Sequence, residues 1–303
     1  IETAILRGVW YPTTVATVSY AAKQLIKKYL EETSDDVSGL PFKLHDFGMR
    51  GVSSFESGGI GGLAHLVNFM GTDTMTALLF ASEYYNQVDV AGFSIPASEH
   101  STITSWGRDK EVDAYKNMIL KFGSGNIFAC VSDSYDIFNA VENLWGGVLQ
   151  ADVKNQNAVL VVRPDSGEPA EVVVKCMELL DKKFGSVVNS KGYKLLNKVR
   201  VIQGDGITIE SIPGILEAVK NAGFSTDNLA MGMGGGLLQH CNRDTFKFAM
   251  KCSAAVIDGH VVDVYKDPIT DKGKKSKTGY MSLLKGENGY FTKKNIPFTR
   301  EED

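Results

Sequence analysis

One alternation recurs along the chain from residue 41 to residue 236, and it constrains the fold more than any other feature. Apolar, β-branched-rich runs of strand length each end in a cluster of Gly, Asp, Ser or Arg, and a helix-like segment follows. Strands that are apolar throughout and alternate with helices are typical of a parallel sheet covered on both faces. Several such units in a row favour a (β/α) barrel, or an incomplete one, over an open doubly wound sheet. The predicted strands are residues 42–47, 91–96, 126–131, 158–162, 199–203 and 228–231.

Helices are predicted between these strands wherever apolar residues recur three and four positions apart. The last sixty residues differ, because two pairs of short runs flank Asp258-Gly259 and Asn288-Gly289, which are typical hairpin turns. We therefore expect an α/β fold, an incomplete (β/α) barrel with an additional antiparallel β section. The predicted parts are a connecting segment from an upstream portion (1–40), a barrel catalytic domain (41–245) and an antiparallel section (246–303). The predicted helices are 74–87, 102–122, 137–145, 168–184 and 209–222, and a basic loop holds Lys272, Lys274, Lys275 and Lys277.

Charge and composition exclude several classes of protein. The net charge of −4, from 32 basic and 36 acidic residues with both signs interspersed, argues against a nucleic-acid partner. No apolar run reaches the length of a membrane span, so no membrane partner is expected. The four cysteines show no CxxC spacing, which indicates a reducing compartment. We expect a cytoplasmic protein, with nuclear or secreted pools as alternatives. The five histidines lack metal-type spacing, which argues against a metal-dependent aldolase-like barrel.

The polar clusters all follow predicted strands, where barrel enzymes carry their chemistry. Phe47 offers a face for a flat ligand and Arg50 a guanidinium for phosphate, although a turn with a satisfied ion pair would look the same. Asp73 is either a helix cap or a pocket carboxylate that accepts from an amide NH2 and repels a carboxylate ligand. His100 is either structural or catalytic.

Arg163 and Asp165 suit a sugar phosphate, since Arg binds phosphate oxygens and Asp accepts hydrogen bonds from hydroxyls. The alternative is that these residues form an ordinary turn with no ligand. The glycine-rich stretches 204–206 and 232–236 end the last two strands, where barrels often bind phosphate. Arg243, Lys266 and the lysine loop add positive charge, although lysine runs are usually solvated surface. This composition fits an anionic sugar phosphate with Mg²⁺, an ion that prefers phosphate oxygens plus one or two carboxylates.

Eight stretches resemble, in the same order, the nicotinate/nicotinamide phosphoribosyltransferase family. They are KLHDFGMRGVSS, NFMGTDT, IPASEHSTIT, VSDSYDIFNA, VRPDSGEP, RVIQGDG, GGGLLQ and VYKDP. The resemblance implies a type II phosphoribosyltransferase fold and a homodimer with active sites shared between subunits. It also implies a pentosyltransferase that condenses nicotinamide with 5-phosphoribosyl 1-diphosphate in NAD salvage. The products would be nicotinamide mononucleotide and diphosphate.

The resemblance also implies site roles. Phe47 would stack on the pyridine ring and Asp73 would bind the carboxamide. His100, Arg163 and Asp165 would be catalytic, with ATP as a coupled substrate through a phosphohistidine at His100 and Mg²⁺ brought by diphosphate, with no protein ligand assigned. Arg243 would reach across from the neighbouring subunit. The remaining residues expected to bind substrate are Arg50, Ser94, Asp133, Gly204, Asp205, Gly235, Lys266 and Lys274.

Two departures and two alternatives accompany the resemblance, and one departure is that the family's C-terminal portion is cut short. The family's second stacking aromatic belongs to a segment that this chain does not contain, so we expect the chain alone to be poorly active. A nicotinate-specific enzyme of the same fold is the nearest alternative, and Asp73 argues against it because two carboxylates would repel. A non-catalytic extracellular signalling role is the other alternative.

Overall fold

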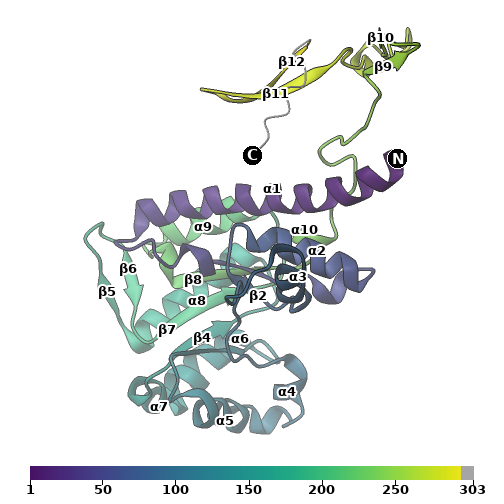
Figure 1. The fold of residues 1–303 in the computed structure, drawn as a ribbon. Coiled ribbons are helices and arrows are strands. Elements are labelled where there is room, and N and C mark those ends of the chain that lie inside the picture. The colour runs from purple at the N-terminus through teal and green to yellow at the C-terminus, as the bar shows by residue number, and fades with distance from the viewer. Residues whose placement is uncertain (295–303) are drawn as a thin grey trace. The chain divides into compact units, whose positions relative to one another are not determined.

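The computed structural model describes residues 1–294 and divides into two compact units (Figure 1). One unit is Arg7–Phe246; the other comprises Ile1–Leu6 and the chain from Lys247. The end of the predicted antiparallel section, residues 295–303, lies outside the described residues. No helix among residues 1–294 is long and apolar enough to cross a membrane.

The larger unit is built on a six-stranded sheet in the order β2-β1-β8-β7-β4-β3, and every neighbouring pair is parallel. Single bridges join Gly71 of β2 to Phe93 and Ala129 of β3 to Ala97, so the 93–97 segment links the two edge strands. The predicted incomplete barrel is confirmed. The strands are β1 (Leu44–Asp46), β2 (Gly71–Thr72), β3 (Ile127–Val131), β4 (Val159–Arg163), β7 (Val199–Gln203) and β8 (Leu229–Met233).

The prediction of a strand at 91–96 was wrong, and β2 was missed. The chain there bonds to its neighbours only at its two ends, and Pro96 has no N–H to donate. The two residues of β2 are too few to show a periodic pattern, and the sequence at 71–74 reads as the start of a helix.

The predicted helices 74–87, 168–184 and 209–222 are confirmed within a few residues, and the chain differs from the prediction between residues 100 and 148. Gly107, at φ 83°, ends the predicted 102–122 helix early and divides it into α4 and α5. Residues 140–148 form a π-helix, in which Trp145 stacks on Tyr115 and donates to Ser132 after β3.

The α-helices are α1 (Glu2–Thr33), α2 (Phe55–Leu66), α3 (Thr76–Tyr85), α4 (His100–Thr104), α5 (Glu111–Phe122), α6 (Ile137–Asn139), α7 (Gln150–Asn155), α8 (Pro169–Phe184), α9 (Ile212–Asn221) and α10 (Gly235–Leu238). The π-helix is η4 (Ala140–Val148), and the 3-10 turns are η1 (Leu40–Phe42), η2 (Met49–Gly51), η3 (Arg108–Lys110), η5 (Thr226–Asn228) and η6 (Lys272–Lys274).

The stretch expected to be a connecting segment, 1–40, is mostly the long helix α1. Its buried residues recur at helical spacing and include Val15, Ala22, Ile26 and Leu30, which join the main hydrophobic core. That core fills the space between the helices and the outer face of the sheet. A second, small cluster of Ala129, Val161 and Ile202 comes from the middle of β3, β4 and β7.

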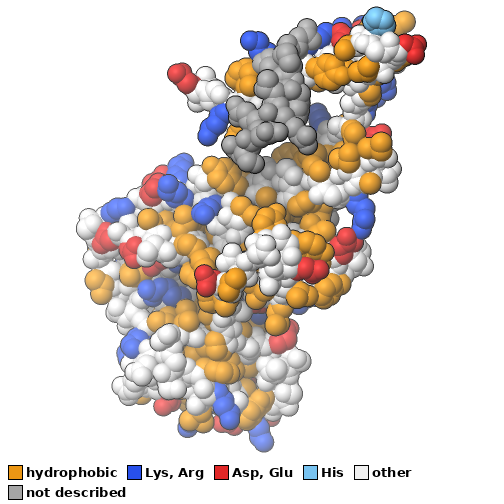
Figure 2. Space-filling view, viewed as in Figure 1, with side chains coloured by type: hydrophobic (Ala, Val, Ile, Leu, Met, Phe, Trp, Pro, Cys, Tyr) orange, Lys and Arg blue, Asp and Glu red, His pale blue; other side chains and the backbone are white. Residues whose placement is uncertain are grey.

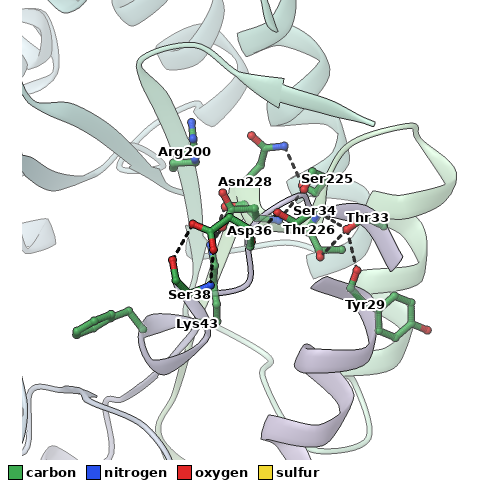
Figure 3. Close-up of polar contacts among 12 residues, drawn as sticks. Tyr29, Thr33, Ser34, Asp36, Ser38, Lys43, Arg200, Ser225, Thr226 and Asn228 are labelled. Carbon is green, nitrogen blue, oxygen red and sulfur yellow. Dashed lines mark hydrogen bonds and ion pairs between the residues drawn. The ribbon is translucent and has the colours of Figure 1, made fainter. Parts of the chain in front are cut away.

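The end of α1 is fixed to the amino-terminal ends of the barrel strands by a polar network (Figure 3). Thr33 Oγ1 bonds Thr226 Oγ1 at 2.9 Å and accepts from the Thr226 N–H. Asn228, fully buried, bonds the backbone of Lys194, Leu196 and Ser225. Lys43 Nζ pairs with Asp227 Oδ1 at 2.8 Å. These groups satisfy one another's hydrogen-bonding capacity at this end of the barrel.

Three antiparallel hairpins complete the described chain. β9 (Ala254–Ile257) pairs with β10 (His260–Asp263), and β11 (Met281–Gly286) pairs with β12 (Gly289–Lys294), which confirms both predicted hairpins. Asp258 and Gly259 both have positive φ, as a two-residue hairpin turn requires. The third hairpin, β5 (Ser186–Val188) with β6 (Lys194–Leu196), was not predicted.

Candidate active site

The carboxyl ends of the barrel strands surround two adjoining cavities. The larger, of about 540 Å³, is lined by Phe47, Arg50, Arg163, Asp165 and the glycine-rich turns after β7 and β8. The smaller, of about 180 Å³, is lined by Phe47, Arg50, Asp73, Glu99 and Arg163. Three side chains therefore border both spaces, and eight of the predicted site residues line one or both. These eight are Phe47, Arg50, Asp73, Arg163, Asp165, Gly204, Asp205 and Gly235.

Phe47 follows β1 and packs over the small interior cluster of Ala129, Val161 and Ile202. Its backbone N–H donates to Met233 O, which extends the pairing of β1 with β8. A Cβ at Gly232 would lie 1.9 Å from the Phe47 ring, so only glycine lets the ring rest on β8. The ring is thus a fixed aromatic platform between the two cavities.

Asp73 follows β2 at the wall of the smaller cavity and is exposed. Its Oδ1 accepts from Ser94 Oγ at 2.5 Å, and its backbone N–H donates to Asp46 O. The helix after it begins at Thr76, with Met75 in the capping position, so Asp73 does not cap that helix. Its carboxylate is oriented by Ser94 and borders the space beside Phe47.

The Arg163 guanidinium comes from the end of β4 and pairs with two carboxylates. Its NH2 lies 2.9 Å from Asp165 Oδ2 and 3.8 Å from Glu99 Oε2. Its Nε is buried and has no hydrogen-bond partner among the described residues. Arg50, by contrast, is exposed and forms no ion pair within residues 1–294. The two arginines give the cavities a positive wall that suits phosphate oxygens.

His100 opens α4 and forms a chain with Asp133 and Ser166. Asp133 Oδ1 lies 2.8 Å from His100 Nε2, and Asp133 Oδ2 accepts from Ser166 Oγ at 2.6 Å. A carboxylate can only accept, so this contact assigns the ring proton to Nε2 and leaves Nδ1 as the basic nitrogen. Glu99 Oε1 lies 3.6 Å from Nδ1, and the other Glu99 oxygen faces Arg163, which places His100 beside the smaller cavity.

Of the other expected residues, Arg243 of the larger unit lines neither cavity, and two belong to the second unit. Arg243 is exposed and pairs with its neighbour Asp244. Lys266 and Lys274 belong to the second unit, where Lys274 pairs with Asp271 and the Lys266 backbone bonds Ser276. Their roles stay predictions. Within residues 1–294, no group of three or more His, Cys, Asp or Glu residues is arranged to hold a metal ion.

The sequence matches known phosphoribosyltransferases over most of its length. Residues 42–295 match the nicotinate phosphoribosyltransferase (NAPRTase) family. The chain belongs to this family. It is 59% identical over 287 residues to the nicotinamide phosphoribosyltransferase of Xanthomonas campestris pv. campestris, which covers 94% of this chain and 61% of the relative. It is also 36% identical to that of Mycoplasma pneumoniae, over 92% of this chain and 62% of the relative.

The chain thus spans about three fifths of the length of these relatives, 61% and 62%. Among solved structures, the nicotinate phosphoribosyltransferase of Porphyromonas gingivalis matches with a TM-score of 0.50 at 14% identity. That match covers 76% of this chain and 51% of the other. At this identity the likeness concerns the fold alone, and it agrees with the barrel described above.

The structure adds four site residues for which no role was predicted. Glu99 lines the smaller cavity, Gln239 and His240 line the larger one, and Ser166 holds Asp133. Glu99 precedes His100 in the stretch IPASEHSTIT, so its position next to a predicted site residue was a usable signal. Gln239 and His240 follow the glycine-rich turn by a few residues, but neither residue type signals a site without its neighbours in space.

Proposed function

We propose that the protein containing this chain is a nicotinamide phosphoribosyltransferase. It would condense nicotinamide with 5-phosphoribosyl 1-diphosphate, giving nicotinamide mononucleotide and diphosphate. The observation that carries the proposal is the smaller cavity, where a fixed aromatic ring lies beside the Asp73 carboxylate, next to a glycine- and arginine-lined cavity. The family membership and the names of its relatives support the same reading.

Asp73 favours nicotinamide over nicotinate in this scheme. Ser94 already occupies Oδ1, and the rest of the carboxylate is available to accept from the amide NH2 of nicotinamide. Nicotinate would present a second carboxylate to the same group, and like charges at that range repel. Stacking on Phe47 would aim the pyridine nitrogen at the anomeric carbon of the sugar.

The chemistry requires positioning more than a strong nucleophile. The pyridine nitrogen is weakly nucleophilic, so departure of diphosphate should lead and give an oxocarbenium-like transition state. Arg163 and Asp165 would hold the ribose region, and the turns containing Gly204, Asp205 and Gly235 would receive the ribose phosphate. Arg50, which has no ion-pair partner within residues 1–294, would stabilise charge on the phosphate groups.

Mg²⁺ would reach the site with the diphosphate. The carboxylates near the larger cavity fit an ion that takes one or two protein oxygens besides phosphate, but they form no cluster of three among the described residues. We therefore assign it no protein ligand. When bound, the ion neutralises the charge of the leaving group.

We further propose that His100 couples ATP hydrolysis to the reaction. With its proton on Nε2 facing Asp133, the imidazole would attack the γ-phosphate through Nδ1, forming an N–P bond as ADP leaves. Asp133 would stabilise the positive charge that develops on the ring, and Ser166 holds Asp133 in place. His100→Ala should abolish stimulation by ATP while leaving ATP-independent turnover, which separates this proposal from the main reaction.

The protein would act as a cytoplasmic homodimer in NAD salvage, with Arg243 from one subunit reaching the site of the other. Lys266 and Lys274 would lie near the phosphate entrance. Lysine and arginine side chains are interspersed with acidic ones on the face shown in Figure 2, as expected of a protein with small-molecule rather than polyanionic partners.

One incubation tests the proposal. The full-length protein is mixed with phosphoribosyl diphosphate, Mg²⁺ and either nicotinamide or nicotinate, with and without ATP, and mononucleotide formation is followed. We expect product from nicotinamide at a much higher kcat/KM than from nicotinate. Faster turnover of nicotinate would reassign the substrate, and no product from either base would reject the enzyme and favour a non-catalytic role.

A further inference from the structure

Gly48, directly after the aromatic platform, has both of its backbone groups held by side chains. Its N–H donates to Asp46 Oδ1 at 2.7 Å, and its C=O accepts from Gln239 Nε2 at 3.0 Å and from the Gly51 N–H at 3.0 Å. These two side chains come from regions 193 residues apart, the end of β1 and the residue after α10. A Cβ on Gly48 would lie 2.6 Å from Leu238, so the peptide is also closely packed.

Asp46 connects this peptide to the residue that we expect to select the base. Its side chain holds Gly48, while its backbone C=O accepts from the Asp73 N–H at 2.9 Å. The Phe47 ring and the Asp73 carboxylate are therefore both tied to one residue, which is fully buried. A nicotinamide that stacks on one and bonds to the other needs that spacing fixed to a few tenths of an ångström.

The environment of Asp46 is unusual for a structural carboxylate. Its Oδ2 is buried beside the equally buried Thr74 hydroxyl, which interacts with the carboxylate, yet neither atom has a well-formed hydrogen bond among the described residues. An apolar side chain of similar size would avoid the cost of burying this group. A carboxylate at position 46 is therefore explained if the fold needs its Oδ1 as the acceptor for the Gly48 N–H.

We propose that Asp46 and Gln239 are positioning residues that clamp the Gly48 peptide and so hold the Phe47 ring at a fixed place relative to Asp73. This inference rests on the proposed function and adds two residues to it. Neither side chain need touch the base. Gln239 also borders the larger cavity, so the clamp connects the platform to the wall of the sugar-phosphate compartment.

Three variants and one control test the clamp in the full-length protein. Asp46→Asn keeps an acceptor for Gly48, whereas Asp46→Leu has the same branching without one. Loss of one such bond should raise the nicotinamide KM about tenfold in Asp46→Leu and in Gln239→Met, with a smaller change in kcat. Asp46→Asn should stay within about threefold of the wild type, since its amide oxygen restores the bond. Ile215→Val in α9 serves as the control for lost stability, since its side chain is buried in the main core.

Amide hydrogen exchange gives a second measurement that does not need catalysis. The Gly48 amide should exchange about tenfold faster in Asp46→Leu than in Asp46→Asn, while the Phe47 amide, bonded to Met233 O, stays protected. If Asp46→Leu does not fold, Gln239→Met decides the KM question alone. An active wild type whose nicotinamide KM is unchanged in both Asp46→Leu and Gln239→Met would overturn the inference. An inactive wild type would instead reject the proposed function, and with it the role of Asp46 and Gln239 in base binding.

Discussion

The two ends of the barrel use similar polar residues for opposite purposes. At the amino-terminal ends of the strands, Lys43, Thr33, Asn228 and Thr226 bond mainly to one another and to nearby backbone (Figure 3). At the carboxyl-terminal ends, Arg50 has no ion-pair partner within residues 1–294 and the Nε of Arg163 has no hydrogen-bond partner there. Polar groups that satisfy one another stabilise the fold, and polar groups with capacity left over can bind a ligand.

The largest expected effect compares an arginine from each end. Arg163→Met should lower kcat/KM by about 10³-fold, because it removes fixed charge from both cavities. Arg200→Met, in neighbouring β7, loses bonds to the carbonyls of Leu196 and Val199 and a charge interaction with Asp227, and should leave kcat/KM within about threefold. Steady-state kinetics of both variants decide the point. Equal losses would contradict the division between the two ends.

The free energy of unfolding should depend more on the amino-terminal end of the barrel, where the polar groups bond to one another. Asn228→Ala removes three side-chain bonds to backbone, including the acceptor for the buried Leu196 N–H, and should lower the free energy of unfolding by about 3 kcal/mol. Ser38→Ala removes an exposed hydroxyl that bonds Asp36 in the same region and should cost less than about 0.5 kcal/mol. Urea unfolding of both variants measures the difference, and a small loss for Asn228→Ala would show that the network is dispensable.

A pH dependence of stability should trace to the site end. Burial raises the pKa of Asp46 to about 6, against the Gly48 N–H, which lowers it. The folded state then binds more protons than the unfolded state between about pH 4 and pH 6, so stability falls as pH rises through that range. From pH 4.5 to pH 7.5 the loss from this group should be about 2 kcal/mol, at about 1.4 kcal/mol per unit below its pKa.

Asp46→Asn should remove that loss, so the variant gains stability over the wild type as pH rises. Asp36→Asn at the other end is the matched control. Bonds from Ser38 lower the pKa of Asp36, so this group is ionised in both states across pH 4.5–7.5, and its substitution should have the same effect throughout. Urea unfolding at pH 4.5 and pH 7.5 measures the stability of both variants relative to the wild type. If the difference between Asp46→Asn and the wild type is the same at both pH values, Asp46 does not have the raised pKa.

The smallest effect concerns choice of base. Asp73→Ser should shift the ratio of kcat/KM for nicotinamide over nicotinate toward nicotinate by about tenfold, because it removes one like charge at an exposed position. Ser94→Ala, which only loosens the Asp73 carboxylate, should shift it by about twofold. Competition between the two bases measures both ratios. An unchanged ratio in Asp73→Ser would remove Asp73 from the selectivity argument.

Several parts of the molecule could be predicted without coordinates because their cause is local. The run 199–203 is rich in β-branched residues and the run 228–231 is mostly apolar, and β7 and β8 lie there. The hairpins near Asp258-Gly259 and Asn288-Gly289 have a local cause: Asp258 and Gly259 adopt positive φ, and Glu287 and Asn288 form the turn between β11 and β12. The 91–96 strand failed because pairing depends on the neighbouring strand's bonding groups, which no local pattern records. The same holds for α1, whose core contacts come from distant helices.

By itself, the sequence determined a parallel α/β barrel with an anionic-ligand site at its strand ends, since alternation and strand-end chemistry are written in neighbouring residues. Its ordered motifs also fixed the family. Only the tertiary structure decided that Asp133 meets His100, that Phe47 rests on Gly232, and that Asp46 and Gln239 hold one peptide from both sides. Each of these contacts joins residues brought together by strand order, and strand order results from packing of the whole sheet rather than from any single segment.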